Sequence, residues 1–232
     1  MAERPIFIPA PDTPGLVKEV SCHLVWNSGF APIQKKKNIK ALHEAAAAAG
    51  YSPLLEVSTK SERKLGRHLS AFHLRVQSYQ YGDIPLECAF QGSKVFERGG
   101  PYTDLYSADV KAAKHDSRLQ NSGRLVGFQF ENVSFPLEPK TAFYDWLYVN
   151  AIFPHREWLS RLRRYAGFTD IEFNPERSIN CQARSCALFV ALLTKNLLEG
   201  AVESPEAFID LISHYSYRPS QPEARGPGVV SR

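Results

Sequence analysis

The amino-acid sequence predicts a single α+β domain that is mainly helical with a small β component. Apolar side chains alternate from Val20 to Trp26, which is typical of a half-buried strand, whereas residues 34–50 have the apolar spacing of a helix. No run of Pro, Gly and Ser divides residues 1–215, so one domain is favoured over several. A chain of 232 residues with 44% hydrophobic residues is long enough to bury one substantial core.

The N-terminal region is expected to form two strands and a helix. Residues 6–8 are a short apolar strand before a break rich in Pro and Gly, and the alternating strand ends at Trp26. Residues 34–50 should be helical because their alanines have the highest helix propensity and Gly50 is a natural stop. The lysines at 35–37 fall in the first turn of this helix, where they are either solvated or face a phosphate group.

The remaining elements follow from the same patterns. The expected strands cover residues 54–57, 72–76, 124–130 and 168–173. The expected helices cover residues 85–96, 108–120, 139–153, 155–165, 179–198 and 205–215. Residues 1–68 are interpreted as an α/β extension packed on a core of residues 69–215, with a separate N-terminal subdomain that ends near Arg67 as the alternative. Residues 216–232 contain almost no apolar side chains, which predicts a disordered tail.

Composition excludes several classes of protein. The net charge of +4 permits contact with phosphates but is too small for a protein that coats nucleic acid. The four cysteines form no C-x-x-C pair and are interpreted as reduced thiols. His43 and His73 lack metal-ligand spacing, so neither a metal nor another cofactor is expected. No stretch approaches the roughly 18 apolar residues of a membrane span, which favours a cytoplasmic protein without membrane contact.

The strongest candidate for chemistry lies within residues 85–96. On a helix over this segment, Glu87, Phe90, Gln91 and Lys94 share one face, with Glu87 and Lys94 about 10 Å apart along the axis. The carboxylate can act as a general acid or base, and an amine in a dry pocket can attack the anomeric carbon of a sugar. Glu and Lys are also common on exposed helix faces without a catalytic role, so spacing alone leaves both interpretations open.

These residues stand in an order that resembles a known family. Leu69-Ser70-Ala71-Phe72 is followed, after a turn at Gly82, by E-x-x-F-Q-x-x-K-x-F over residues 87–96. This resembles the core signature of the NADAR family, the YbiA-like N-glycosidases, in which F-S-N-F precedes S-E-x-x-F-Q-x-x-K-F. Other segments are similar to that family at residues 140–146, 168–170 and 178–180. Three segments resemble the branch of antitoxins encoded beside DarT-type DNA ADP-ribosyltransferase toxins, at residues 26–31, 42–45 and 99–106.

The resemblance implies removal of ADP-ribose from a modified nucleobase. Glu87 would then be the catalytic carboxylate and Lys94 the amine, which we hypothesise to form a Schiff base with the opened ribose. Lys94 must lose its proton to react, and burial or a neighbouring cation would favour that loss. Asp170 would bind or orient the ribose hydroxyls. Two departures from the family pattern, Ala71 in place of asparagine and Phe168-Thr169 in place of Trp-Gly, affect the expected substrate contacts.

Further residues are expected to contact the substrate. Asn180 and Arg184 lie one turn apart on the expected last long helix, where they either bind phosphate or serve as a cap and a solvated cation. Tyr102 lies beside a glycine-rich break, in either a base-stacking loop or a hydrophobic cluster. Trp146 either stacks on a base or belongs to the core. The expected substrate-binding residues are Ser70, Phe72, Gln91, Trp146, Asn180, Arg184 and Tyr102.

We therefore predict a cytoplasmic, metal-independent ADP-ribosyl hydrolase that removes ADP-ribose from DNA bases and acts as the antitoxin of a DarT-type toxin. Its partners would be ADP-ribosylated DNA or nucleotide and a cognate toxin. Two alternatives stay open. One is a metabolic N-glycosidase that acts on ribosylamino phosphates, and the other is a non-catalytic protein that neutralises the toxin by binding it.

Overall fold

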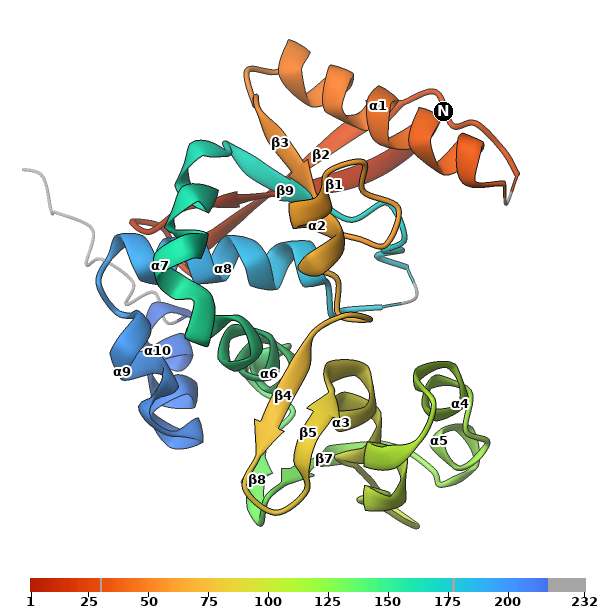
Figure 1. Ribbon diagram of the computed structural model, residues 1–232, viewed down its shortest axis with the longest axis vertical. Coiled ribbons are helices and arrows are strands. Elements are labelled where there is room, and N and C mark those ends of the chain that lie inside the picture. The colour runs from red at the N-terminus through yellow and green to blue at the C-terminus, as the bar shows by residue number, and fades with distance from the viewer. Residues whose placement is uncertain (30, 177, 217–232) are drawn as a thin grey trace, which may run out of the picture.

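The largest sheet among the described residues combines the N-terminal strands with a strand from residues 167–169. The computed structural model describes residues 1–29, 31–176 and 178–216, so the expected disordered tail, apart from Ser216, lies outside the described residues. The sheet has the strand order β2-β1-β9-β3 (Figure 1), formed by Val17–Leu24, Ala2–Pro9, Gly167–Thr169 and Leu54–Glu56. β9 pairs antiparallel with β1 and parallel with β3, so a strand from late in the chain completes the sheet that the N-terminal strands begin.

Helices cover both faces of this sheet. In Figure 1, α1 (Pro32–Ala48) lies above it and α8 (Gln182–Thr194) below it. Successive side chains of a strand point to opposite faces. Ile6 of β1 therefore packs in the cluster under α1, together with Leu42, while Phe7 enters the main core. This burial on both faces holds the first strands firmly against the rest of the chain.

A second group of elements surrounds α6 (Ala142–Ile152), which is buried along almost its whole length. A hairpin of β4 (Arg75–Ser78) and β5 (Gly82–Pro85) leads into α3 (Leu86–Gly92). A three-stranded sheet follows, in the order β6-β7-β8, formed by Lys94–Phe96, Leu125–Phe130 and Val133–Phe135. The connection from β6 to β7 contains η1 (Thr103–Ser107), α4 (Val110–Lys114) and α5 (Arg118–Asn121).

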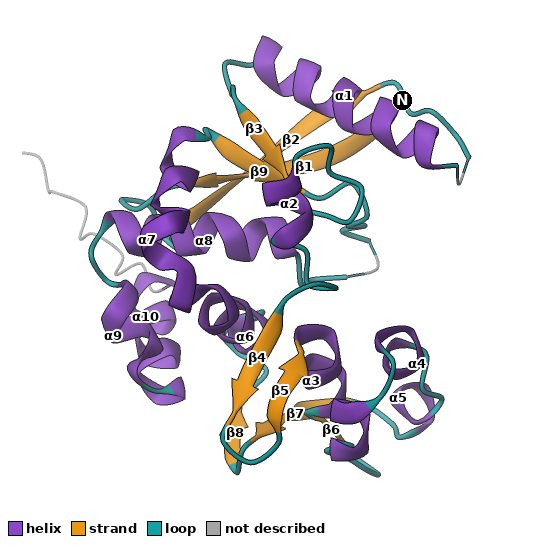
Figure 2. Ribbon diagram, in the orientation of Figure 1, coloured by secondary structure: helices purple, strands orange, loops and turns teal. Residues whose placement is uncertain are grey.

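Short helices complete the fold (Figure 2). They are α2 (Lys64–His68), η2 (Phe153–His155), α7 (Arg156–Leu159), η3 (Ser160–Arg164), α9 (Leu198–Glu203) and α10 (Pro205–Ser216). The predicted α+β class is confirmed by this mixture of helices with small sheets. Within the described part of the chain, no helix is both long enough and apolar enough to cross a membrane.

The expected helix over residues 85–96 is wrong in its second half. α3 ends at Gly92, and Lys94 begins β6, where it pairs with Phe128 of β7. Val95 and Phe96 are residue types that fit a pleated surface, and β7 supplies the ladder partner that an isolated helix lacks. Lys94 is therefore not on the helical face that carries Glu87.

Other boundaries also differ from the sequence prediction. The expected helix over 108–120 is broken into α4 and α5, and the expected strand over 168–173 ends at Thr169. β5 and β8 were not expected. β8 follows a two-residue turn at Glu131 and Asn132, whose positive φ values of 49° and 67° suit a tight hairpin but are unusual for glutamate.

Candidate active site

Glu87, Gln91 and Lys94 form a hydrogen-bonded chain. The Gln91 amide Nε2 donates to Oε1 of Glu87 at 2.8 Å, and Nζ of Lys94 donates to Oε1 of Gln91 at 2.6 Å. This orientation of the amide satisfies both neighbours, because a carboxylate accepts and an ammonium group donates. Glu87 and Lys94 thus lie close together, as predicted. The Gln91 amide links them, and Lys94 reaches Glu87 from the strand that follows α3.

The chain of polar groups is shielded from water on the helix side. Glu87 and Gln91 are only 7% and 6% exposed, whereas Lys94 is half-buried. The Lys94 ammonium lies 4.9 Å from the ring centroid of Phe90. Burial lowers the pKa of Lys94, the Glu87 charge opposes that shift, and the Lys114 charge adds to it. The site therefore brings a buried carboxyl group next to an amine that gives up its proton more readily than a surface lysine.

Tyr144 lies beside this chain and was not among the expected site residues. Its ring packs edge-on against Phe90, with centroids 5.2 Å apart and an interplanar angle of 86°. Burial raises the pKa of Tyr144 well above its ordinary value, and the charges of Glu87, Asp170 and Asp145 raise it further. The phenol therefore keeps its proton and can act as a hydrogen-bond donor.

Asp170 is joined to the loop that carries Ser70. Gln182, at the first turn of α8, donates to Oδ2 of Asp170 at 2.9 Å and accepts from the backbone N–H of Ala71 at 2.7 Å. The Ser70 hydroxyl is fully buried and has no hydrogen-bond partner among the residues that the structure describes. Such a group is costly unless something else satisfies it. Gln182 was not among the expected site residues. It links the segment of Asp170 to the segment of Ser70, both of which were expected at the site.

A small cavity opens next to these aromatic side chains. It has a volume of about 280 Å³, close to the lower end for small-molecule sites. Tyr144 and Phe128, both in contact with Phe90, form part of its wall, and Asn180 and Thr141 add polar groups. The cavity is large enough for one flat ring with a few hydrogen bonds.

Comparison with known families tests the resemblance that the sequence motifs indicated. A family model described as "DarT1-associated NADAR antitoxin" matches residues 2–222. The chain belongs to this family. The resemblance drawn from the sequence motifs is therefore confirmed, and the match includes the N-terminal strands and α1 as well as the core. A comparison with curated proteins finds no match.

Two residues that were expected to contact the substrate, Trp146 and Tyr102, interact with other side chains of this NADAR protein. Trp146 is 9% exposed and packs among Phe130, Phe135 and Phe143, which agrees with the core interpretation of its ring. Its indole N–H nevertheless has no partner among the described residues. The Tyr102 hydroxyl forms a hydrogen bond with the Ser122 hydroxyl.

Asn180 and Arg184, which were expected to bind phosphate together, lie in different surroundings. Asn180 lines the small cavity and precedes α8, which begins at Gln182. The Arg184 guanidinium forms an ion pair with Asp145 and also donates to the Thr141 hydroxyl at 3.0 Å. Its role toward phosphate stays a prediction.

Phe72 and Lys114 lie at the edge of the site. Phe72 is 41% exposed, and Nζ of Lys114 lies 5.5 Å from its ring centroid. Because the Lys114 charge also acts on Lys94, these three side chains form one neighbourhood. An exposed ring with a cation over its face is suited to stacking on a base while the cation binds the phosphate of that nucleotide.

The buried Glu56 lies next to Asp170, and the two carboxyl groups form an acidic pair. Glu56 of β3 accepts from the hydroxyls of Ser58 and Thr169, both at 2.6 Å, and from the backbone N–H of Ile171 at 2.9 Å. Burial, followed by the charge of Asp170, raises the pKa of Glu56 to about 8. Burial likewise raises the pKa of Asp170 to about 7.

The stability of the NADAR protein should therefore fall as pH rises. In the unfolded chain both acids titrate near pH 4, so between about pH 4 and about pH 8 the folded state holds protons that the unfolded state releases. We expect urea denaturation to give a lower free energy of unfolding near pH 8 than near pH 5. Glu56→Gln should flatten this dependence, whereas Glu62→Gln at an exposed position should not. An unchanged pH dependence in Glu56→Gln would contradict the assignment.

Proposed function

We propose that this NADAR protein is an ADP-ribosyl hydrolase that cleaves the N-glycosidic bond between ADP-ribose and a nucleobase of DNA, and that this activity underlies its antitoxin role. The observation that carries the proposal is the chain from Glu87 through Gln91 to Lys94. The amide separates the carboxyl group from the amine, so each is oriented without direct neutralisation by the other.

The chemistry assigns a separate task to each group. The Lys94 amine bonds to C1 of the ribose while the bond from C1 to the base nitrogen breaks, and Glu87 gives that nitrogen a proton. The C1–O4 bond of the ribose then breaks as the adduct nitrogen forms a double bond to C1 and passes one proton to O4, which gives the ring-opened Schiff base. Water that is deprotonated by the Glu87 carboxylate then hydrolyses it to ADP-ribose and the free amine. Asp170, which Gln182 holds in place, supports the proposal as a carboxyl group that can accept from the ribose hydroxyls.

The substrate is tested with two compounds offered separately. One is a single-stranded DNA oligonucleotide that carries one ADP-ribosylated base, and the other is a ribosylamino phosphate. We expect mass spectrometry to show unmodified DNA and free ADP-ribose, and no change in the second compound. Turnover of the ribosylamino phosphate with an inert oligonucleotide would instead favour a metabolic N-glycosidase.

The role of Lys94 predicts a distinctive pH profile. Because the step needs a neutral Lys94 amine together with a protonated Glu87, kcat/KM should give a bell-shaped pH profile, and the limb set by Lys94, whose pKa is lowered by burial, should lie below the ordinary lysine value of 10.5. Lys94→Arg keeps the charge but cannot supply a neutral nucleophile, so we expect at least about a 100-fold loss of activity and no Schiff base trapped by borohydride. Lys111→Arg on the exposed face of α4 is the matched control. Full activity in Lys94→Arg would rule out the covalent route.

A further inference from the structure

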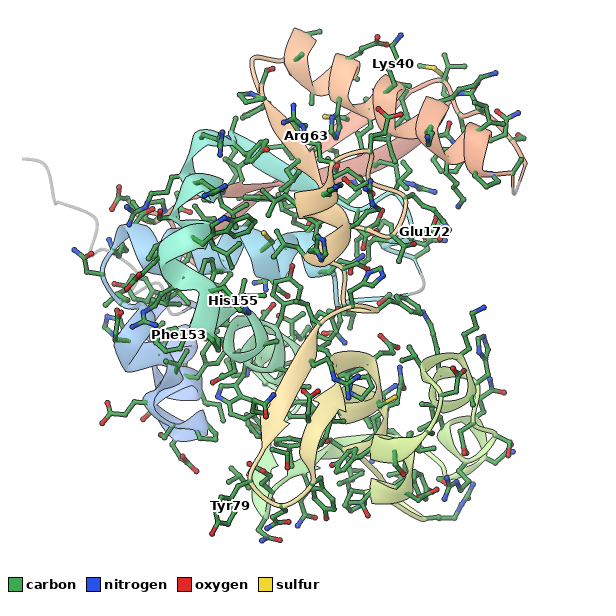
Figure 3. The ribbon with its side chains drawn as sticks, viewed as in Figure 1. Lys40, Arg63, Tyr79, Phe153, His155 and Glu172 are labelled. Atoms are coloured by element: carbon green, nitrogen blue, oxygen red, sulfur yellow. The ribbon has the colours of Figure 1, made fainter. Side chains whose placement is uncertain are left out.

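A groove between α2 and the α7–η3 segment has a strongly positive lining. Its volume is about 550 Å³, and it is lined by Arg63, Lys64, Leu65, His68, Trp158, Arg161, Arg164 and Tyr165. Four of these eight residues are Lys or Arg, and none is Asp or Glu. We refer to this surface as the α2–α7 groove. In Figure 3, Arg63 lies where α2 begins, between α1 and α7.

The cations of the α2–α7 groove are not neutralised by carboxylates. Within the described ranges, none of the four takes part in an ion pair, unlike Lys36 and Lys40 of α1, which pair with Glu62 and Glu44. The bonds of Arg161 and Arg164 to backbone carbonyls, at 2.9 and 3.1 Å, each use one of five guanidinium N–H donors. Charge of one sign thus gathers in this groove although the whole chain carries only +4.

The groove also contains an exposed aromatic ring. Trp158 is 48% exposed, and the Arg161 guanidinium lies 4.2 Å from the centroid of its ring. A large apolar ring at the surface is costly to leave in water and suits stacking with a base. Rings combined with unpaired cations are the surface chemistry that binds single-stranded nucleic acid, in which bases are free to stack and phosphates are regularly spaced.

The α2–α7 groove lies close to the candidate active site. His68 lines the groove, and Phe72, at the edge of the site, is four residues further along the chain. At most about 14 Å separates their Cα atoms, because an extended chain spans about 3.6 Å per residue. This is the length of about four stacked nucleotides at 3.4 Å each. A strand in the groove can therefore continue into the site.

We propose that the α2–α7 groove binds the single-stranded DNA next to the modified base, with phosphates on Arg63, Lys64, Arg161 and Arg164 and a base stacked on Trp158. This assignment of the groove rests on the proposed function, because the groove would hold the DNA strand from which the active site removes ADP-ribose. A single strand is favoured over a duplex because the exposed Trp158 ring needs an unpaired base as its partner.

Binding is tested with an unmodified, fluorescein-labelled 12-nucleotide DNA by fluorescence anisotropy, which needs no catalytic activity. Arg164→Gln should weaken binding several-fold and lower the slope of log Kd against log salt by about 0.7, the value for one phosphate contact on a single strand. Trp158→Ala should weaken binding by roughly 5- to 150-fold. Arg163→Gln is the matched control, because Arg163 is the neighbouring residue, carries the same charge and donates instead to the Leu193 carbonyl.

Kinetics separate this proposal from the proposed function. On an ADP-ribosylated oligonucleotide, Arg164→Gln and Trp158→Ala should raise KM, whereas on an ADP-ribosylated mononucleotide they should match the parent protein. Equal DNA affinity and salt slope in Arg164→Gln and Arg163→Gln would overturn the groove assignment. Loss of toxin binding in Arg164→Gln or Trp158→Ala, with unchanged DNA binding, would also overturn it. If the parent protein turned over neither substrate, the proposed hydrolase activity would be refuted. The anisotropy measurement would still show whether the groove binds single-stranded DNA.

Discussion

Glu87→Gln is expected to lower kcat for removal of ADP-ribose from DNA by about 10²- to 10⁴-fold, the range that general acid–base catalysis contributes. Glutamine has nearly the same size and can accept the hydrogen bond from Gln91 with its amide oxygen, so the chain to Lys94 keeps its geometry. It cannot give a proton to the departing base. The free energy of unfolding should change by less than about 1 kcal/mol, which circular dichroism during urea titration can check.

The same variant distinguishes an enzymatic antitoxin from one that acts by contact. Cells that express the cognate toxin should be protected by the parent protein and not by Glu87→Gln. Glu97→Gln is the control, because Glu97 is exposed and pairs with Arg124 at the surface. If Glu87→Gln protected cells as well as the parent protein does, neutralisation would depend on binding rather than hydrolysis.

Asp145→Ala is expected to lower the free energy of unfolding by about 3 kcal/mol. The Asp145 side chain is 2% exposed and accepts from the hydroxyls of Ser185 and Thr141, both at 2.6 Å, and from the Arg184 guanidinium. Its removal leaves the partly buried Arg184 charge and two hydroxyls without their acceptor. Thr141 also holds a left-handed backbone conformation, with φ of 70°, at the start of α6.

Thermal unfolding measures this effect directly. For a domain of this size, a change of about 3 kcal/mol corresponds to a Tm lower by roughly 6 to 12 °C. Asp104→Ala removes the same kind of side chain from an exposed pair with Arg118 and should cost less than about 1 kcal/mol. A similar Tm for the two variants would mean that the Asp145 network does not join α6 to α8.

The elements that the sequence predicted best are those with a complete local signal. The helix over 34–50 and the strand over 124–130 lie within two residues of α1 and β7, because alanine propensity and strict alternation act within the segment itself. β8 could not be predicted in this way, since its turn uses Glu131 and Asn132 at positive φ rather than a glycine. β9 has three residues, and its place in the sheet depends on partners more than a hundred residues away.

The candidate site shows the same division. The sequence contains Glu87, Gln91 and Lys94 in an order that resembles the motif of the family to which the chain belongs. Gln182 carried no such signal, because its bonds to Asp170 and Ala71 bring together segments 12 and 111 residues away from it. Tyr144 was hidden for a related reason, since its apolar helix predicted only burial.

The sequence by itself determined the α+β class and the family, and it supplied the candidate groups Glu87, Gln91 and Lys94, because residue type and short-range order specify these. Only the tertiary structure decided how the groups meet. Lys94 approaches Glu87 from a strand whose ladder partner is β7, and the cations of the α2–α7 groove come from segments about 100 residues apart in the chain. Pairing between distant segments depends on the whole core, which local propensity does not contain.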